Sequence, residues 1–234
     1  MVIDFHTHIF PKDIAEKTID HFKKMVKTKT QQYDYPDTGF YTDGTLESLK
    51  LSMKESGVDY SVILPVVTKP AQFESINRYA ALINGNEGII SFGGIHPHTK
   101  DYKADLEFIK SLGLAGIKIH PDYQKTYIND PQYIKIIEYA ARLDLIVLTH
   151  AGDTLGISEA YCTPPKMREL IDRANADFSK VIVAHAGGFH CWGDVEKYLV
   201  GQSILFDVSS CFGHTDDLQI KRIIKNHGAD KILF

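Results

Sequence analysis

The feature that most limits the fold of this 234-residue chain is a regular alternation of short apolar runs with longer amphipathic ones. Several short runs are continuous in Val, Ile and Leu, which is typical of strands buried on both faces of a parallel sheet. Eight candidate strands follow from these runs. They cover residues 2–5, 60–64, 89–95, 116–119, 145–149, 181–184, 204–208 and 231–234.

Helical patterns lie between these runs. Pro131 stands where a first-turn proline is expected, ahead of the apolar stripe at Ile134 and Ile137. Gly113 follows another stripe that ends at Leu112, and it is expected to cap that helix. Alternating strands and helices imply βαβ units and a parallel sheet. Eight such strands predict an α/β fold of the (β/α)₈ TIM barrel class, with an open doubly wound sheet as the alternative.

The whole chain, residues 1–234, is expected to form a single barrel domain, since single α/β barrels commonly reach this size. The irregular stretch 28–44 is long for a loop inside a compact domain, and it carries four aromatic residues. Such loops are usually functional or poorly ordered. This stretch follows the first strand, so it is interpreted either as a lid over the catalytic face or as a surface insertion.

Composition excludes several classes of protein. The net charge of −4 and the lack of a long basic run disfavour nucleic-acid binding. Three scattered cysteines indicate neither a disulfide framework nor a CxxC zinc site, and a reducing compartment suits them. No signal-peptide pattern and no apolar run of about 18 residues is found, so we expect a cytoplasmic protein without a membrane partner. The expected partner is a small-molecule substrate, and homo-oligomerisation is left open.

Histidines are concentrated at the ends of the candidate strands. Barrel active sites are built at the carboxyl ends of the strands, whereas scattered surface histidines would not gather there. Seven of the 11 histidines fall at or just after such ends: His6, His8, His96, His98, His120, His150 and His185.

His6 and His8 are separated by one residue on the first strand, so their side chains point the same way and can converge on one ion. Neutral imidazole suits zinc and similar divalent metals. Asp4 shares their side of the strand and could support a ligand. An HxH triplet alone is weak evidence. Because His150 and His185 close two further apolar strands, a metal centre is favoured over separate structural histidines.

Lys118 and His120 share one side of the strand that precedes His150. Both could point into the barrel mouth. A buried lysine there could bind an anionic substrate, act with a lowered pKa, or ligate metal after carboxylation. The alternative is a purely structural role, in which the lysine forms an ion pair inside the barrel. His96 and His98 could line the same cavity, and contact between these histidines and substrate is left open.

Together these motifs resemble the amidohydrolase superfamily, specifically the amidohydrolase-2 branch that includes aminocarboxymuconate semialdehyde decarboxylase. The resemblance spans nearly the whole chain, and the order and spacing of the motifs make it specific. The segments that carry it are Asp-Phe-His-Thr-His from residue 4, Gly-Ile-Lys-Ile-His-Pro from 116, Thr-His-Ala-Gly from 149, Ala-His-Ala-Gly-Gly from 184 and Lys-Ile-Leu-Phe from 231.

The resemblance implies that His6, His8 and His150 bind a divalent metal, most often zinc. It also implies that His185 either orients a metal-bound water or binds a second metal. Lys118 is similar to the carboxylated lysine that bridges two metals in binuclear members. One zinc ion is the preferred arrangement, because the branch is mainly mononuclear. Apart from the resemblance, His120 and His96 stand as the candidate substrate-binding residues.

One departure from the family pattern concerns the last strand. The family continues there with a Gly-Ser-Asp-like turn whose aspartate binds the metal and acts as base, whereas this sequence ends at Phe234. The final barrel helix is also missing. The expectation is therefore a portion of a longer protein. The alternative is that another carboxylate, Asp153 or Asp207, takes the role.

The predicted activity is metal-dependent hydrolysis of a small amide, ester or lactone by a metal-activated water. A nonoxidative decarboxylase on the same metal site is the first alternative. An arginine placed to hold the departing carboxylate would favour this alternative. All five arginines fall in predicted helices, which argues mildly against it. A non-enzymatic metal-binding or metabolite-binding barrel is the second alternative, since fold alone does not determine function.

Overall fold

A computed structural model describes residues 1–29, 42–154 and 156–234, without the side chains of 25–29. Each of the eight predicted runs overlaps a strand, the first strand extends two residues beyond its run, and the run 89–95 is divided in two at Phe92. The strands are β1 (Ile3–Thr7), β2 (Tyr60–Ile63), β3 (Ile89–Ser91), β4 (Gly93–Gly94), β5 (Gly116–Ile119), β6 (Ile146–Thr149), β7 (Val181–Val183), β8 (Leu205–Asp207) and β9 (Ile232–Leu233).

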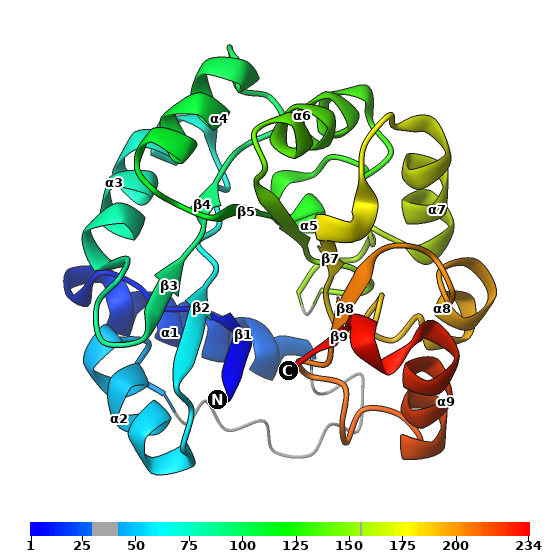
Figure 1. Cartoon of the computed structure of the whole chain (residues 1–234). Helices are drawn as coiled ribbons and strands as arrows, with labels where there is room; N and C mark the ends of the chain where they lie inside the picture. Colours follow the sequence, from blue (N-terminus) through cyan, green and yellow to red (C-terminus); the bar gives the residue numbers. More distant parts are fainter. Residues whose placement is uncertain (30–41, 155) are drawn as a thin grey trace.

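The strands form two parallel sheets, one of order β1-β2-β3 and the other running from β4 to β9 in sequence order. Phe92 joins β3 directly to β4, and the Phe5 N–H donates a 2.7 Å hydrogen bond to the Phe234 carbonyl oxygen. Strands therefore surround a common centre with helices outside them (Figure 1). The barrel architecture is confirmed, although strand pairing is interrupted on both sides of the β1-β2-β3 sheet rather than continuous around it.

Helices connect the strands as the alternation predicts. Pro131 opens its helix, and the carboxylate of Asp130 caps it by accepting the N–H of Gln132 at 2.8 Å. Gly113 has a φ of +75° just after its helix ends, as expected for a C-cap glycine. The α-helices are α1 (Lys12–Lys29), α2 (Leu46–Ser56), α3 (Phe73–Ile83), α4 (Tyr102–Ser111), α5 (Pro121–Gln124), α6 (Pro131–Arg142), α7 (Pro164–Arg173), α8 (Trp192–Tyr198) and α9 (Asp217–His227). Short 3₁₀ turns lie at Pro70–Gln72, Phe178–Lys180 and Ala229–Lys231.

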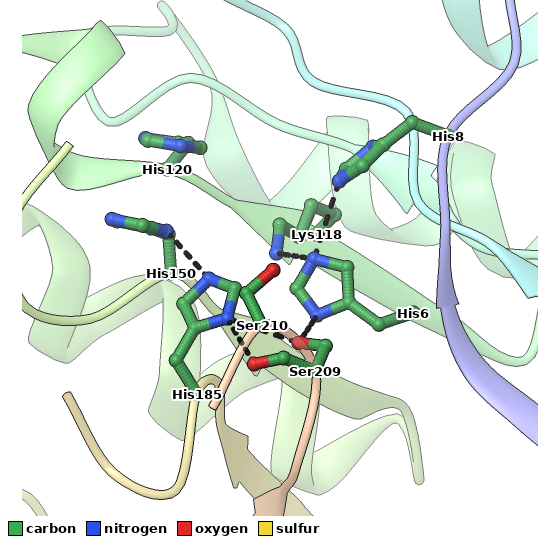
Figure 2. A pocket seen from close by; sticks show the side chains of 8 residues that line it. All are labelled: His6, His8, Lys118, His120, His150, His185, Ser209 and Ser210. Carbon is green, nitrogen blue, oxygen red and sulfur yellow. Dashed lines mark hydrogen bonds between the residues drawn. The ribbon is translucent and has the colours of Figure 1, made fainter. Parts of the chain in front are cut away.

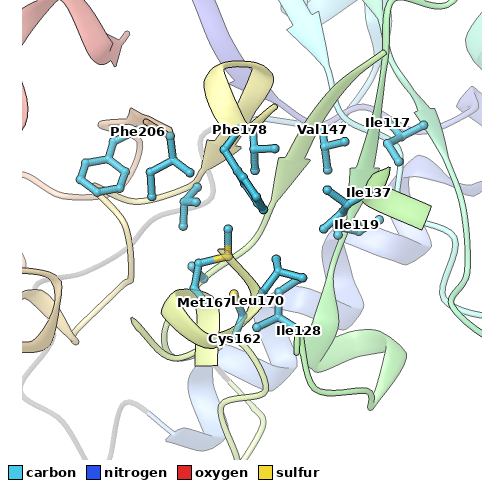
Figure 3. Close-up of a cluster of buried hydrophobic side chains, with 14 of the residues drawn as sticks. Ile117, Ile119, Ile128, Ile137, Val147, Cys162, Met167, Leu170, Phe178 and Phe206 are labelled. Carbon is cyan, nitrogen blue, oxygen red and sulfur yellow. The ribbon is translucent and has the colours of Figure 1, made fainter. Parts of the chain in front are cut away.

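Alternate residues of the strands pack in two different clusters. Ile117, Ile119 and Val147 pack with helical residues such as Ile137 and Met167 (Figure 3). The opposite faces of β6 and β7 contribute Leu148 and Ile182 to a smaller cluster whose fully buried members all come from strands or strand ends. Lys118 pairs in register with Leu148, so its side chain lies on this inner face of the barrel, where it is completely buried.

The predicted lid at residues 28–44 lies for the most part outside the described residues, which resume at residue 42. Among the helices of the described ranges, none is both long and apolar enough to span a bilayer.

Candidate metal centre

A polar cavity of about 190 Å³ opens at the carboxyl ends of the strands. Five of the seven strand-end histidines line it, together with the lysine of β5 and two serines that follow β8 (Figure 2). The sequence therefore predicted the place of the site and most of its lining. The lining residues are His6, His8, Lys118, His120, His150, His185, Ser209 and Ser210.

His6 and His8 bring their Nε2 atoms within 3.2 Å of one another. The second nitrogen of each ring faces an atom that can only accept a hydrogen bond. The Nδ1–H of His6 donates to the Asp207 carboxylate at 2.9 Å, and the Nδ1–H of His8 donates to the Leu64 carbonyl at 2.8 Å. A neutral imidazole carries one proton. Both Nε2 atoms therefore point lone pairs toward the cavity, and neither supplies a proton to the other.

Ser209 determines the tautomer of His185, with the same result as for His6 and His8. Its Nδ1 lies 3.0 Å from both the carbonyl and the hydroxyl oxygen of Ser209. The single hydroxyl proton of Ser209 goes to Asp207, with an O–O distance of 2.5 Å. Both Ser209 oxygens therefore accept, and the His185 proton resides on Nδ1. The Nε2 of His185 keeps a lone pair.

His150 presents the other kind of ring nitrogen. Its Nε2 lies 2.8 Å from the Thr154 hydroxyl oxygen, whose own proton is donated to the Asp122 carboxylate at 2.5 Å. The His150 Nε2 therefore donates, and its Nδ1 keeps a lone pair. That Nδ1 lies 3.1 Å from the Nε2 of His185. The lone pairs of these two nitrogens therefore face one another in the cavity, as those of His6 and His8 do.

These four lone pairs make the cavity suitable for a cation. Burial lowers the pKa of all four rings, and neighbouring positive groups lower it further, so the imidazoles are neutral at pH 7. Two nitrogens bound to one tetrahedral zinc ion at about 2.0–2.1 Å would be separated by roughly 3.3 Å. The observed separations of 3.2 and 3.1 Å match that value. The donor chemistry and the spacing within each pair of rings thus fit a divalent metal, whereas the ligand atoms of His6, His8 and His150 do not all lie within 4.8 Å of one another.

Lys118, Asp122 and Asp207 are fully buried charged groups beside these rings. The Nζ of Lys118 lies 3.4 Å from the Nε2 of His6, and burial lowers the pKa of Lys118 from 10.5 to about 7. Burial alone would raise the pKa of Asp207, but the hydrogen bonds that it accepts from His6 and Ser209 help to hold it below its usual range. Among the His, Cys, Asp and Glu side chains of the described residues, one group of three has ligand atoms that all lie within 4.8 Å of one another. Its members are His6, His185 and Asp207.

The model of the amidohydrolase family matches residues 3–234 of this sequence. The chain belongs to the amidohydrolase-2 family. No curated protein sequence is similar enough to match it.

Solved structures share the barrel of this family member at low sequence identity. An uncharacterised TIM-barrel protein of Bordetella bronchiseptica is 13% identical with a TM-score of 0.70, covering 100% of this chain and 84% of that one. A 5-carboxyvanillate decarboxylase of Novosphingobium aromaticivorans with bound manganese is 14% identical with a TM-score of 0.67, covering 99% and 85%. A probable 2-pyrone-4,6-dicarboxylic acid hydrolase of Acinetobacter baumannii with bound citric acid is 16% identical with a TM-score of 0.58, covering 99% and 81%.

His120 lies at the edge of the amidohydrolase cavity. Its ring stacks on His150, with centroids 4.1 Å apart and planes inclined by 5°, and on Tyr123 at 4.0 Å. Its Nδ1 accepts the backbone N–H of Tyr123 at 3.4 Å as the N-cap of α5, so its remaining proton is on Nε2. Burial lowers the pKa of His120 well below 6.5, which keeps the ring neutral.

His96 is not among the residues that line this cavity. Its Nδ1 accepts the backbone N–H of His98 at 3.1 Å, and its ring also donates to the Thr68 backbone carbonyl. Of the two alternative carboxylates, Asp153 pairs with His190 at 3.5 Å away from the lining, whereas Asp207 contacts the His6 ring directly. Asp4 accepts the backbone N–H of His6 at 3.0 Å.

Ser209, Asp122 and Thr154 contact the histidine rings although sequence reasoning gave them no role. A signal was available for Ser209 and Asp122, because each lies near a strand end, two residues after Asp207 and His120 respectively. The backbone is also strained here, since His185 and Ala186 have φ values of +60° and +50°. Non-glycine residues with positive φ cluster at functional sites.

Proposed function

We propose that this amidohydrolase-2 protein is a metal-dependent hydrolase acting on a small amide, ester or lactone. One divalent ion, with zinc as the first candidate, is held by His6, His8 and His150. The observation that carries the proposal is the set of four imidazole lone pairs directed into one cavity. The N–H on the other nitrogen of each ring donates a hydrogen bond to an oxygen atom of the protein. Family membership and the manganese in the decarboxylase relative also support a divalent metal.

When bound, such an ion would supply Lewis-acid polarisation of a carbonyl oxygen and lower the pKa of a water molecule. The chain's own groups provide the remaining functions. The Nε2 lone pair of His185 accepts a hydrogen bond from water and so orients it. The Nε2–H of His120 donates to a substrate oxygen at the cavity edge. Lys118, with a pKa of about 7, holds or releases a proton at Nζ near neutral pH.

The proposal includes a single domain formed by residues 1–234 and a small-molecule substrate. The cavity volume of about 190 Å³ suits a compact substrate or one end of a larger molecule. Every residue that lines it carries a polar side chain, so hydrogen bonds and charge are expected to contribute to substrate recognition.

Nonoxidative decarboxylation is the second candidate, because the family and its structural relatives include a decarboxylase. Hydrolysis is preferred because no arginine lines the cavity formed by the described residues. Four of the five arginines form ion pairs on helices: Arg78 with Glu74, Arg168 with Asp172, Arg173 with Glu169 and Arg222 with Glu196. Assays for carbon dioxide release and for ester or lactone opening on matched carboxylated substrates would distinguish the two reactions.

The test of the metal site is the metal content of the purified protein and of two variants. His6→Ala and His8→Ala each remove one of two facing lone pairs, so both should lose bound metal and hydrolytic activity together. His21→Ala, on the exposed surface of α1, is the matched control and should retain both. Full metal content and full rate in either His6→Ala or His8→Ala would refute the proposed metal site.

A further inference from the structure

We propose that Asp122 and Thr154 are positioning residues that fix the tautomer of His150, so that His150 offers Nδ1 rather than Nε2 to the metal. This inference rests on the proposed metal site and extends it to residues outside the cavity lining. Neither residue is expected to touch substrate. Both act through the histidine ring.

Asp122 is the fixed end of this arrangement. It lies in α5, directly after β5, and its side chain is completely buried. One carboxylate oxygen accepts the backbone N–H of Tyr161 at 2.7 Å, and the other accepts the Thr154 hydroxyl at 2.5 Å. An ionised carboxylate can only accept hydrogen bonds. The single proton of the Thr154 hydroxyl is therefore committed to Asp122.

The consequence for His150 follows from the direction of that hydrogen bond. Since the Thr154 oxygen has no proton left to donate, it accepts from the His150 Nε2 at 2.8 Å. The Asp122 carboxylate also lies 3.7 Å from the same Nε2, which favours the partial positive charge of an N–H there. Both contacts place the ring proton on Nε2.

The alternative tautomer would close the site to metal. With its proton on Nδ1, His150 would donate to the Nε2 lone pair of His185 at the observed 3.1 Å separation. The two rings would then satisfy one another, and two inward lone pairs would be lost. Asp122 and Thr154 prevent this His150–His185 hydrogen bond because they hold the His150 proton on Nε2, on the opposite side of the ring.

The backbone holds Thr154 in place for this task. Gly152 donates its N–H to the Cys162 carbonyl at 2.8 Å, and Asp153 donates to the Phe189 carbonyl at 2.9 Å. The first bond closes the segment between β6 and α7 on itself, and the second attaches this segment to the one that follows β7. Thr154 is thereby positioned from two directions.

Thr154→Val tests the inference, because valine keeps the shape of threonine and removes the hydroxyl. Zinc affinity is measured by competition with a chromophoric chelator, and the tautomer of His150 by ¹⁵N NMR of the metal-free protein. We expect zinc binding to weaken by about 10–100-fold, the usual cost of losing such an outer partner. We also expect the His150 proton to move to Nδ1. Thr154→Ser keeps the hydroxyl and should preserve both affinity and tautomer.

The outcomes separate this inference from the proposed function. If the original protein binds zinc, and Thr154→Val binds it equally well with the proton still on Nε2, the positioning role is refuted while the metal site stands. If the original protein binds no divalent metal, the proposed function fails, whereas the NMR measurement still tests the tautomer. Should Thr154→Val not fold, Asp122→Asn replaces the negative acceptor by an amide. Unchanged zinc affinity and tautomer there would equally refute the inference.

Discussion

Replacing Lys118 by methionine should change how the stability of the metal-free protein depends on pH. The Lys118 ammonium is fully buried, and burial lowers its pKa from 10.5 to about 7. The unfolded chain therefore binds more protons than the folded chain between these two values. The free energy of unfolding then rises with pH in that window and loses this contribution as pH falls toward 7.

The size of the effect follows from the two pKa values. The difference between 10.5 and about 7 corresponds to about 5 kcal/mol over the whole window. Between pH 7 and pH 9 the folded protein passes from half-protonated to nearly deprotonated Lys118, which contributes about 2 kcal/mol. Methionine fills a similar volume without a titrating group. The variant should lack this rise and should be the more stable protein at pH 7.

Urea unfolding with a chelator present, at pH 7, 8 and 9, measures the difference. Cysteines and other groups titrate in both proteins, so the relevant quantity is the free energy of unfolding of the original protein minus that of Lys118→Met. Lys110→Met in α4 removes an exposed lysine and is the matched control, with no expected change in pH dependence. Parallel pH profiles for the original protein and Lys118→Met would show that the pKa of Lys118 is not depressed, and the reasoning would be wrong.

Two further substitutions test the supports of the site. Asp207→Asn should weaken zinc binding by about 10–100-fold in a chelator competition, because Asp207 holds the Nδ1–H of His6. It should also lower the free energy of unfolding by about 1–3 kcal/mol, since the carboxylate accepts from His185 and Ser209 as well. Unchanged zinc affinity would refute its role. Gly152→Ala should destabilise the fold by more than about 1 kcal/mol, because φ is +84° and a Cβ would lie 2.2 Å from the Phe189 backbone. If Gly152→Ala unfolded at the same urea concentration as the original protein, this expectation would be contradicted.

The order of strands and the location of the site were predictable because both depend on local patterns. Apolar runs marked the strands, and histidine positions at their ends marked the end of the barrel at which the cavity opens. The parity of Lys118 on its strand correctly predicted that it points into the barrel mouth, because side chains alternate across a strand. Each of these inferences needed only residues close together in the sequence.

The hydrogen-bond partners of the rings were not predictable in this way. The partner of His6 is 201 residues away at Asp207, and the Asp122 that fixes His150 acts through a threonine on a different loop. His96 has the same strand-end placement as the cavity histidines, yet its ring is satisfied by the backbone of His98 and Thr68. A strand-end pattern alone does not show which way such a ring turns.

Metal affinity in this barrel should therefore depend on the groups that accept the ring protons as well as on the rings themselves. Each of the four inward rings gives its proton to an oxygen of another residue: a carboxylate for His6, main-chain carbonyls for His8 and His185, and a hydroxyl for His150. A carbonyl acceptor cannot be removed by changing a side chain, whereas Asp207 and Thr154 can. The tautomers of His6 and His150 are consequently the ones that substitution can change. Metal affinity should respond to Asp207 and Thr154 far more than to the side chain of Leu64.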